Sequence, residues 1–540
     1  MKKLYKYIAI AFAGVSLCSC NDWLDGVDST SSVDDSTTWR EESTVTAQVD
    51  YFYRYLNSWG QFGEAEFDGS ITESLTDAFK YNHSALGARG GTPYRYATDF
   101  DYISPTQNAL SGWSTAYTQI RYINQFLQLM RTYSTFGEEK NNLWEAQARF
   151  FRAFVYFQLA KRYDGAIIET TLPDGPNHAL SPIDEVYDFI EEDLQFAIDN
   201  LPLKWDAANL GRISSVAAQA FLSRVELYAG RWQKAYDAAE AVIQSGQFSL
   251  MPNYADACKG SNSEAIIQFF YGATSGPSNS WDTWYSAVPA GNRFETGSVG
   301  VPTQEMVECY EYADGTKVDW EPWHTTTTVP PPYDKLEPRF AASIVYRGST
   351  WMGVTMDCCL DGPNGVFQAY GDAPYGWNTT STGYFLKKLC DESHTDLAAV
   401  KGHQTWVALR YAEVLLNKAE AAFRLNLTAE AQAAMNQVRA RVNLPGVYSI
   451  GEPWFEAYRN ERKVELSYEG HLYWDMRRWR LCEEYDGIRL HGFEITQAGT
   501  YTYVEVDLAD RRFNPKTYCF PLPYSEVQNN SLAVQFPAWR

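Results

Sequence analysis

Cys20 is the residue whose surroundings most directly imply a chemical modification. Three lysines lie in the first six residues, an apolar stretch follows at residues 8–17, and residues 17–20 read Leu-Cys-Ser-Cys. A basic start, a short apolar run and small residues before the cut are the marks of an export signal. We therefore expect residues 1–19 to be a lipoprotein signal peptide and the Cys20 thiol to carry lipid, which would anchor the chain to a bacterial membrane surface without spanning it. Ordinary secretion without lipid is the alternative.

Aromatic side chains are the second chemically distinctive set, because they make up 15% of the chain. Residues 79–96 and 275–294 combine them with amide and charged side chains among Gly, Pro, Ser and Thr. Flat rings pack against the C–H faces of a sugar, while amides and charged groups bond its hydroxyls. The alternative is that each ring packs locally and holds its loop down. Trp281 and Trp284 are favoured as ligand contacts because their neighbours offer little apolar material to pack on.

No pattern of a known catalytic site is present. The chain has no HExxH, GxSxG, P-loop or GxGxxG segment, and its seven histidines are scattered without an i, i+4 pair. Glu461, Arg462, Glu465 and Glu469 lie at helical spacing and are interpreted as a structural ion network. A retaining glycosidase, which needs two carboxyl groups about 5 Å apart, is kept as an alternative that a turnover assay would test. We expect no enzyme activity and no cofactor.

The cysteines after Cys20 do not indicate a metal site. There are seven, and none forms a CxxC pair, whereas zinc sites use paired ligands at short spacing. We expect no metal and interpret these residues as buried free thiols. One or two disulfides are the alternative.

The charge balance argues against nucleic acid as a partner. The 540 residues hold 45 Lys and Arg against 67 Asp and Glu, which gives a net charge of −22. Phosphate backbones require clustered Lys and Arg. No second apolar run of about 18 residues follows the signal, so no membrane span is expected.

Helix-pair repeats dominate the expected fold. Residues 214–246 predict two short helices joined by a turn at Ala229-Gly230, with alanines where the helices would cross. Small residues at the crossing and a Gly turn match the tetratricopeptide pattern of ~34 residues. Residues 407–444 repeat the pattern, and residues 141–201 form a degenerate pair. Such pairs stack to bury a continuous core, so we predict a mainly α fold with a superhelical scaffold.

Irregular segments separate these repeats. Residues 258–400 contain three consecutive prolines and many Gly, Trp and Tyr residues, and an insert of this length usually carries function or small strands of its own. Residues 59–108 lack a sustained period and are interpreted as a long loop region. Residues 20–45 are interpreted as the lipidated cysteine and a polar tether, and residues 46–540 as a single domain. Periodicity also predicts helices near Thr46, from Trp113 and over about 453–480, and a hairpin-like stretch at 490–510.

Short motifs follow one another in order along most of the chain. They include Cys20-Asn21-Asp22-Trp23-Leu24-Asp25, Trp113-x₃-Tyr117-x₂-Ile120-x₃-Asn124, Ser245-Gly246-Gln247-Phe248, Arg410-Tyr411-Ala412-Glu413, Asp475-x₂-Arg478-Trp479, Pro521-Leu522-Pro523 and Gln535-Phe536-Pro537-Ala538-Trp539. As a set, they resemble the SusD/RagB-type outer-membrane lipoproteins of the Bacteroidetes. The tail departs from the family's Asn-Pro-Gly at Phe536-Pro537-Ala538, and residues 258–400 match least.

The resemblance implies both a fold and a function. The fold would be tetratricopeptide-like helix pairs with a loop-rich, ligand-binding insert that carries small β elements. The function would be capture of a glycan on the outer face of the outer membrane and its delivery to a SusC-like, TonB-dependent transporter, without catalysis. A peptide ligand, as in the RagB branch, is the alternative, and a scaffold that binds only the transporter is a third hypothesis. A peptide site should be a deep cavity, whereas a glycan site should be an open aromatic surface.

With a glycan as ligand, the resemblance implies contacts in the insert and in the loops before Trp113. The candidate ligand-binding residues are therefore Tyr81, Asn82, Tyr94, Trp281, Asp282, Trp284, Tyr285, Asn292, Arg293 and Trp320.

Overall fold

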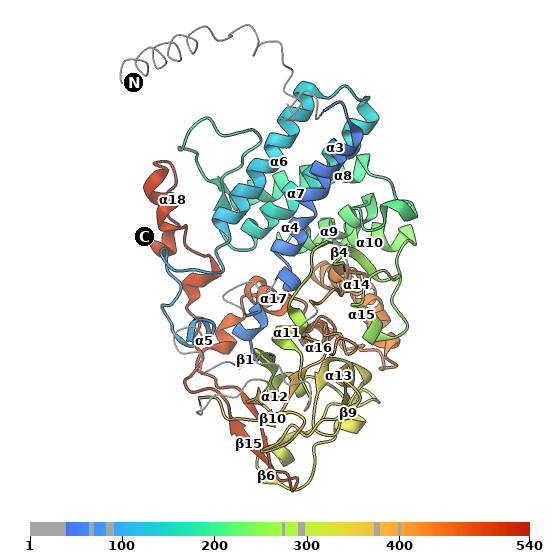
Figure 1. Ribbon diagram of the computed structural model, residues 1–540, viewed down its shortest axis with the longest axis vertical. Coiled ribbons are helices and arrows are strands. Elements are labelled where there is room, and N and C mark those ends of the chain that lie inside the picture. Colours follow the sequence, from blue (N-terminus) through green and yellow to red (C-terminus); the bar gives the residue numbers. More distant parts are fainter. Residues whose placement is uncertain are drawn as a thin grey trace, which may run out of the picture.

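The computed structural model describes residues 39–63, 70–82, 91–272, 276–289, 297–371, 379–397 and 401–540. Long helices fill one part of the molecule, and short strands gather with loops at the opposite end (Figure 1). The predicted signal peptide, Cys20 and most of the tether lie outside these ranges, as do Asn292 and Arg293. Among the helices of the described residues, none is both long and apolar enough to cross a bilayer.

The longer helices account for most of the regular structure. They are α3 (Glu42–Phe52), α6 (Trp113–Tyr133), α7 (Glu138–Ala160), α8 (Ile183–Asn200), α9 (Ser215–Tyr228), α10 (Trp232–Ser245), α14 (Tyr411–Arg424), α15 (Thr428–Arg441) and α16 (Glu452–Glu465). Shorter helices are α4 (Arg54–Ser58), α5 (Gly91–Thr98), α11 (Trp281–Tyr285), α12 (Gln304–Val307), α13 (Pro338–Ser343), α17 (Leu472–Trp479) and α18 (Tyr524–Asn529).

The three predicted helix pairs are present as α7 with α8, α9 with α10 and α14 with α15. The Ser214 hydroxyl caps α9 by accepting a hydrogen bond from the Ala217 amide at 3.2 Å. In α10, Ala235, Ala238 and Ala239 are almost fully buried, so the backbones of neighbouring helices approach closely. Neighbouring pairs also touch, because α8 packs on α9 and α10 on α14. The predicted stacked repeats are therefore confirmed.

The strands are short and form small sheets. The longer pairings are β1 (Phe79–Tyr81) with β5 (Gly300–Pro302), β4 (Ala265–Phe269) with β13 (Trp406–Arg410), and β14 (His491–Ile495) with β15 (Tyr501–Glu505), which also pairs with β6 (Thr326–Thr327). Two-residue pairs are β2 (Gly165–Ala166) with β3 (Ser181–Pro182), β7 (Ile344–Val345) with β12 (Phe385–Leu386), β8 (Thr350–Trp351) with β9 (Val354–Thr355), and β10 (Val366–Phe367) with β11 (Thr379–Thr380). The insert at 258–400 thus carries the small β elements expected of it.

Two segment predictions were wrong and one was confirmed. Residues 59–108 are not all loop, because they hold β1 and α5. The helix expected over 453–480 is divided into α16 and α17, since Tyr468 and Gly470 adopt left-handed φ angles of 63° and 83° that a helix does not tolerate. The hairpin expected at 490–510 is formed by β14 and β15.

A buried ion network holds the C-terminal helices to the rest of the core. Arg410 bonds Glu264 and Glu465, both at 2.6 Å, and Glu469 at 2.8 Å. Arg339 adds a bond to Glu465 at 3.1 Å. These side chains are buried, which confirms the interpretation of Glu465, at the end of α16, and Glu469, after it, as members of a structural ion network. The seven cysteines of the described residues are free thiols, and no group of three or more His, Cys, Asp or Glu there is arranged to hold a metal ion.

Candidate functional site

The two aromatic segments selected from the sequence touch beside one small sheet, because the Phe79 ring of the first lies 6.3 Å from the Tyr285 ring of the second. The sheet joins β1, in the first segment, to β5, which follows the second segment. Strand β1 pairs antiparallel with β5, which places Tyr81 opposite Gly300. A Cβ atom at Gly300 would lie 2.1 Å from the Phe79 ring, so only glycine lets the strands approach this closely. The pairing continues as the Asn82 amide donates to the Val299 carbonyl at 2.7 Å.

Asn82 joins three segments at this point. Its Nδ2 donates to the Ser298 carbonyl at 3.1 Å and to the Thr379 carbonyl at 2.6 Å, and its Oδ1 accepts from the Ser381 amide at 3.0 Å. The side chain is buried. We call Asn82, Ser298, Thr379 and Ser381 the Asn82 junction. Because both ends of the amide are occupied within the fold, Asn82 positions loops rather than presenting a free group to a ligand.

Lys80 fixes two tyrosine rings beside the junction. Its buried Nζ lies 2.7 Å from Asp507 Oδ1, 3.8 Å from the Tyr370 ring centroid and 4.9 Å from that of Tyr94. Burial lowers the pKa of Lys80 to about 8, although Asp507 opposes this shift. The half-buried Tyr94 is held further because its hydroxyl accepts from the Leu508 amide at 2.8 Å. Tyr370 was not among the candidates chosen from the sequence, although the residues around it show the same mixture of Gly, Pro and aromatic side chains.

Trp281 and Tyr285 lie in the core, which contradicts the expectation that their rings are exposed. They are 1% and 2% exposed, and their rings stack at 4.2 Å. The Trp281 ring also packs on Phe62 at 5.1 Å. The physical reason is α11, since a single helical turn brings positions four apart onto the same, buried face. Tyr81 and Trp320 are buried as well.

Asp282 is likewise occupied inside the fold. Its carboxylate accepts from His394 Nδ1 at 2.8 Å, from the Asp391 amide at 2.9 Å and from Gln404 Nε2 at 3.1 Å. Burial raises the pKa of Asp282, and the His394 hydrogen bond opposes the rise. In this structure Asp282 ties Asp391, His394 and Gln404 to α11, and its side chain is completely buried.

Trp284 is the most exposed of the predicted aromatic residues that the structure describes, at 38%. Its amide donates to the Ser280 carbonyl at 3.1 Å, and its carbonyl accepts from the Val299 amide at 2.9 Å. Val299 also bonds Asn82, so Trp284 stands directly beside the Asn82 junction. The arrangement offers an exposed indole ring next to the point where three loop-bearing segments converge.

Comparison with protein families identifies the fold. Residues 263–539, just over half of the chain, match the model described as the SusD family. The chain belongs to the SusD family. Residues 27–227 match a second SusD-type model, described as "Starch-binding associating with outer membrane". That description supports an association of this SusD-family protein with the outer membrane.

Individual SusD-like proteins extend the comparison. A SusD-like protein of Bacteroides ovatus is 23% identical over 74% of this chain and 72% of its own length. SusD-like protein P25 of Formosa agariphila is 22% identical over 99% of both chains. A solved SusD-like protein of Bacteroides fragilis is 26% identical, with a TM-score of 0.79 over 94% of this chain and 98% of its own. The predicted fold class, a helix-pair scaffold with small β elements, is therefore that of known SusD-like structures.

Proposed function

We propose that this SusD-family protein binds a glycan on the surface around Trp284 and the Asn82 junction. One observation carries the proposal. The two segments chosen for their sugar-binding composition lie far apart in sequence, yet the Phe79 ring of the first packs beside the Tyr285 ring of the second at 6.3 Å, and Trp284 of the second segment is 38% exposed. An exposed indole supplies the flat apolar face that a sugar ring packs against. Asn292 and Arg293, which follow Trp284 in the same segment, and Tyr94 are the proposed hydrogen-bonding partners for the hydroxyls.

Relatives support a glycan as the ligand class. One matching family model is described as starch-binding. A solved B. fragilis protein with a TM-score of 0.76 is described as a SusD-like carbohydrate-binding protein, and another solved structure, with a TM-score of 0.61, as a laminarin-binding SusD-like protein. A peptide ligand would call for a deep cavity, whereas the Trp284 side chain is 38% exposed to solvent.

The proposal extends to how the glycan is passed on. Lipid on Cys20 would hold the protein at the outer face of the outer membrane, and the bound glycan would be handed to a SusC-like, TonB-dependent transporter. The support is the signal pattern at residues 17–20 together with the outer-membrane family model. The proposed role is non-catalytic, because stacking and hydrogen bonding are the chemistry assigned to these residues. Asp282, the buried acid nearby, is already committed to His394 and Gln404.

Affinity electrophoresis of the mature chain tests the proposal. Gels would contain amylopectin, laminarin, xylan, mannan or host mucin glycans, and Trp284→Ala would run beside the wild type. Tyr448→Ala is the matched control, because Tyr448 is 73% exposed and lies in a different loop. We expect one polysaccharide to retard the wild type and the control but not Trp284→Ala. Free migration of the wild type in every gel would contradict glycan binding. Retardation that survives in Trp284→Ala would place the site elsewhere.

A further inference from the structure

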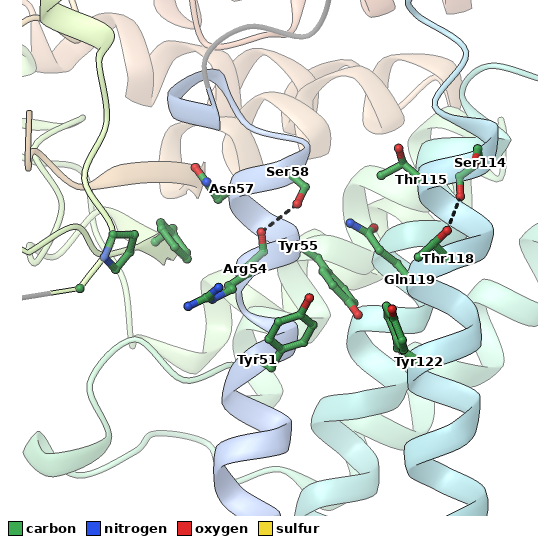
Figure 2. Close-up of a pocket in the computed structure, with 13 residues that line it drawn as sticks. Tyr51, Arg54, Tyr55, Asn57, Ser58, Ser114, Thr115, Thr118, Gln119 and Tyr122 are labelled. Atoms are coloured by element: carbon green, nitrogen blue, oxygen red, sulfur yellow. Dashed lines mark hydrogen bonds between the residues drawn. The ribbon is translucent and has the colours of Figure 1, made fainter. Parts of the chain in front are cut away.

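A groove of about 850 Å³ lies between the N-terminal helices and α6, on elements that do not build the Trp284 surface. Figure 2 shows its walls, with α3 and α4 on one side and α6 on the other. Pro277 and Gly276 close one end. We call this hollow the tyrosine groove; its other lining residues are Tyr51, Arg54, Tyr55, Asn57, Ser58, Ser114, Thr115, Thr118, Gln119, Tyr122 and Phe269.

Two exposed tyrosine rings flank the groove. Tyr51 of α3 is 47% exposed and Tyr122 of α6 is 49% exposed. Tyr55 lies between them (Figure 2), buried, with its ring edge-on to Tyr51 at 6.1 Å and 84°. Arg54 lies over the Tyr51 ring at 5.6 Å, and about half of each ring remains exposed beside the same hollow. This is the geometry that holds a flat ring by stacking.

The polar side chains of the groove are oriented in advance. Gln119 Oε1 accepts from Trp59 Nε1 at 2.8 Å, and Asn57 Oδ1 accepts from the Tyr271 hydroxyl. In the described part of the chain neither amide NH₂ group has a partner, so both remain as donors for a ligand. The exposed Arg54 forms no ion pair with any described residue and adds further donors.

The charge of the lining selects the ligand class. Among the described residues that line the groove there is no Asp or Glu, and Arg54 is the one that carries a formal charge. A cation would find no carboxylate there, and a polyanion would meet a single positive group on a protein of net charge −22. A neutral chain with apolar ring faces and many hydroxyls, which is an uncharged oligosaccharide, fits both the rings and the donors.

We propose that the tyrosine groove is a second glycan site, distinct from the Trp284 surface. The proposal rests on the proposed function, because the same glycan chain would occupy both. Segment 275–294 links the two places, since Gly276 and Pro277 line the groove and Trp284 follows in the same segment. Two sites on one protein raise the retention of a polymer above that of either site alone.

The test compares variants of the mature chain in gels of amylopectin, laminarin, xylan, mannan and polygalacturonate. They are Tyr51→Ala/Tyr122→Ala, Trp284→Ala, the triple variant, and Tyr448→Ala/Tyr524→Ala as a control with two exposed tyrosines outside the groove. We expect the groove variant to weaken retardation by a neutral polysaccharide about tenfold, a difference of about 1.4 kcal/mol. The triple variant should be weaker than Trp284→Ala. Tyr51→Phe/Tyr122→Phe keeps the rings and should retain binding.

Each of the following outcomes would contradict one part of the proposal. If the wild type is retarded but the groove variant matches the control, and the triple variant matches Trp284→Ala, the second site is wrong and glycan binding stands. If no gel retards the wild type, glycan binding itself fails and the second site with it. Preference for polygalacturonate would overturn the neutral class. Capture of casein peptides that is lost in the groove variant, without retardation in any gel, would make the groove a peptide site. Because Tyr51 and Tyr122 are half exposed, equal melting temperatures for wild type and variant would confirm that folding is intact.

Discussion

The Asn82 side chain donates to the Thr379 carbonyl oxygen at 2.6 Å across 297 positions of sequence. The same amide bonds Ser298 and Ser381, so one buried group holds three segments together. Segments without long strands or helices cannot satisfy their backbone groups by ladder hydrogen bonds and depend on such side chains instead. The position of Trp284 relative to these segments is therefore tied to Asn82.

Asn82→Ala should destabilise the fold and weaken glycan binding together. The change removes the hydrogen bonds that the Asn82 side chain donates to the carbonyls of Ser298 and Thr379 and accepts from the amide of Ser381, and each such bond contributes about 0.5–1.5 kcal/mol. We expect the free energy of unfolding in urea to fall by about 2–4 kcal/mol. Asn529→Ala, at an exposed position, is the control and should change it by less than about 0.5 kcal/mol. An unaltered unfolding midpoint for Asn82→Ala would show that the junction is not required.

Trp281→Ala and Trp284→Ala should have opposite consequences although they lie three residues apart. Trp281 is 1% exposed and stacked on Tyr285, so its removal leaves a cavity that costs about 3–5 kcal/mol. Trp284→Ala should leave the free energy of unfolding within about 1 kcal/mol of the wild type, since its ring is more than a third exposed. Chemical denaturation measures the first effect and affinity electrophoresis the second. Equal stabilities for the two variants would contradict the assignment of faces on α11.

His471 should make the fold sensitive to mild acid. Burial lowers the pKa of this imidazole to about 4, against the opposing effect of Glu413, whose carboxylate lies 3.7 Å away. The unfolded chain therefore takes up a proton before the folded chain does, and the free energy of unfolding falls as the pH drops from about 6.5 to about 4. The total loss is on the order of 3 kcal/mol.

Denaturation across this pH range, compared between variants, isolates the effect. In His471→Gln the free energy of unfolding should depend less on pH over this range, because glutamine at position 471 does not titrate. His403→Gln, at an exposed position, should keep the slope of the wild type. Parallel curves for the wild type and His471→Gln would show that another group accounts for the acid sensitivity.

Arg410→Met should be among the most destabilising single changes in the chain. Arg410 is the partner of three buried carboxylates, those of Glu264, Glu465 and Glu469. Removing one member of a buried ion group leaves uncompensated charge and costs about 3–5 kcal/mol. The exposed pair of Arg95 with Asp99 offers the control, since Arg95→Met should cost less than about 1 kcal/mol. Comparable melting temperatures for the two variants would contradict a structural role for the network.

The helix pairs could be predicted because their signal is local. The helices α9 and α10 pack on each other across the short turn at Gly230, so the pattern of buried alanines that marks the pair falls within residues 214–246. The break between α16 and α17 was missed because Tyr468 carries no sequence mark of a left-handed conformation. Strand β1 was not predicted within residues 59–108, because three residues are too few for an alternation of apolar and polar side chains to be visible. Its partner β5 also lies more than two hundred residues away.

The candidate site remains a prediction, and the structure agrees with its segments better than with its individual residues. Loop composition indicated where aromatic and polar groups concentrate, and the two segments touch through the rings of Phe79 and Tyr285. Composition could not tell Trp281 from Trp284, because the difference is the single helical turn of α11. The tyrosine groove was missed because Tyr51 and Tyr122 lie on helices, where their spacing resembles that of core residues.

The sequence by itself determined the family, the helix pairs and the segments rich in sugar-binding side chains, because each depends on residues close together in the chain. Only the tertiary structure decided which rings face solvent, that Asn82 is a structural anchor and that Tyr51 of α3 and Tyr122 of α6 line the same groove. Burial and pairing at these positions depend on elements that are distant in sequence, and a local sequence pattern does not indicate which distant element will pack there.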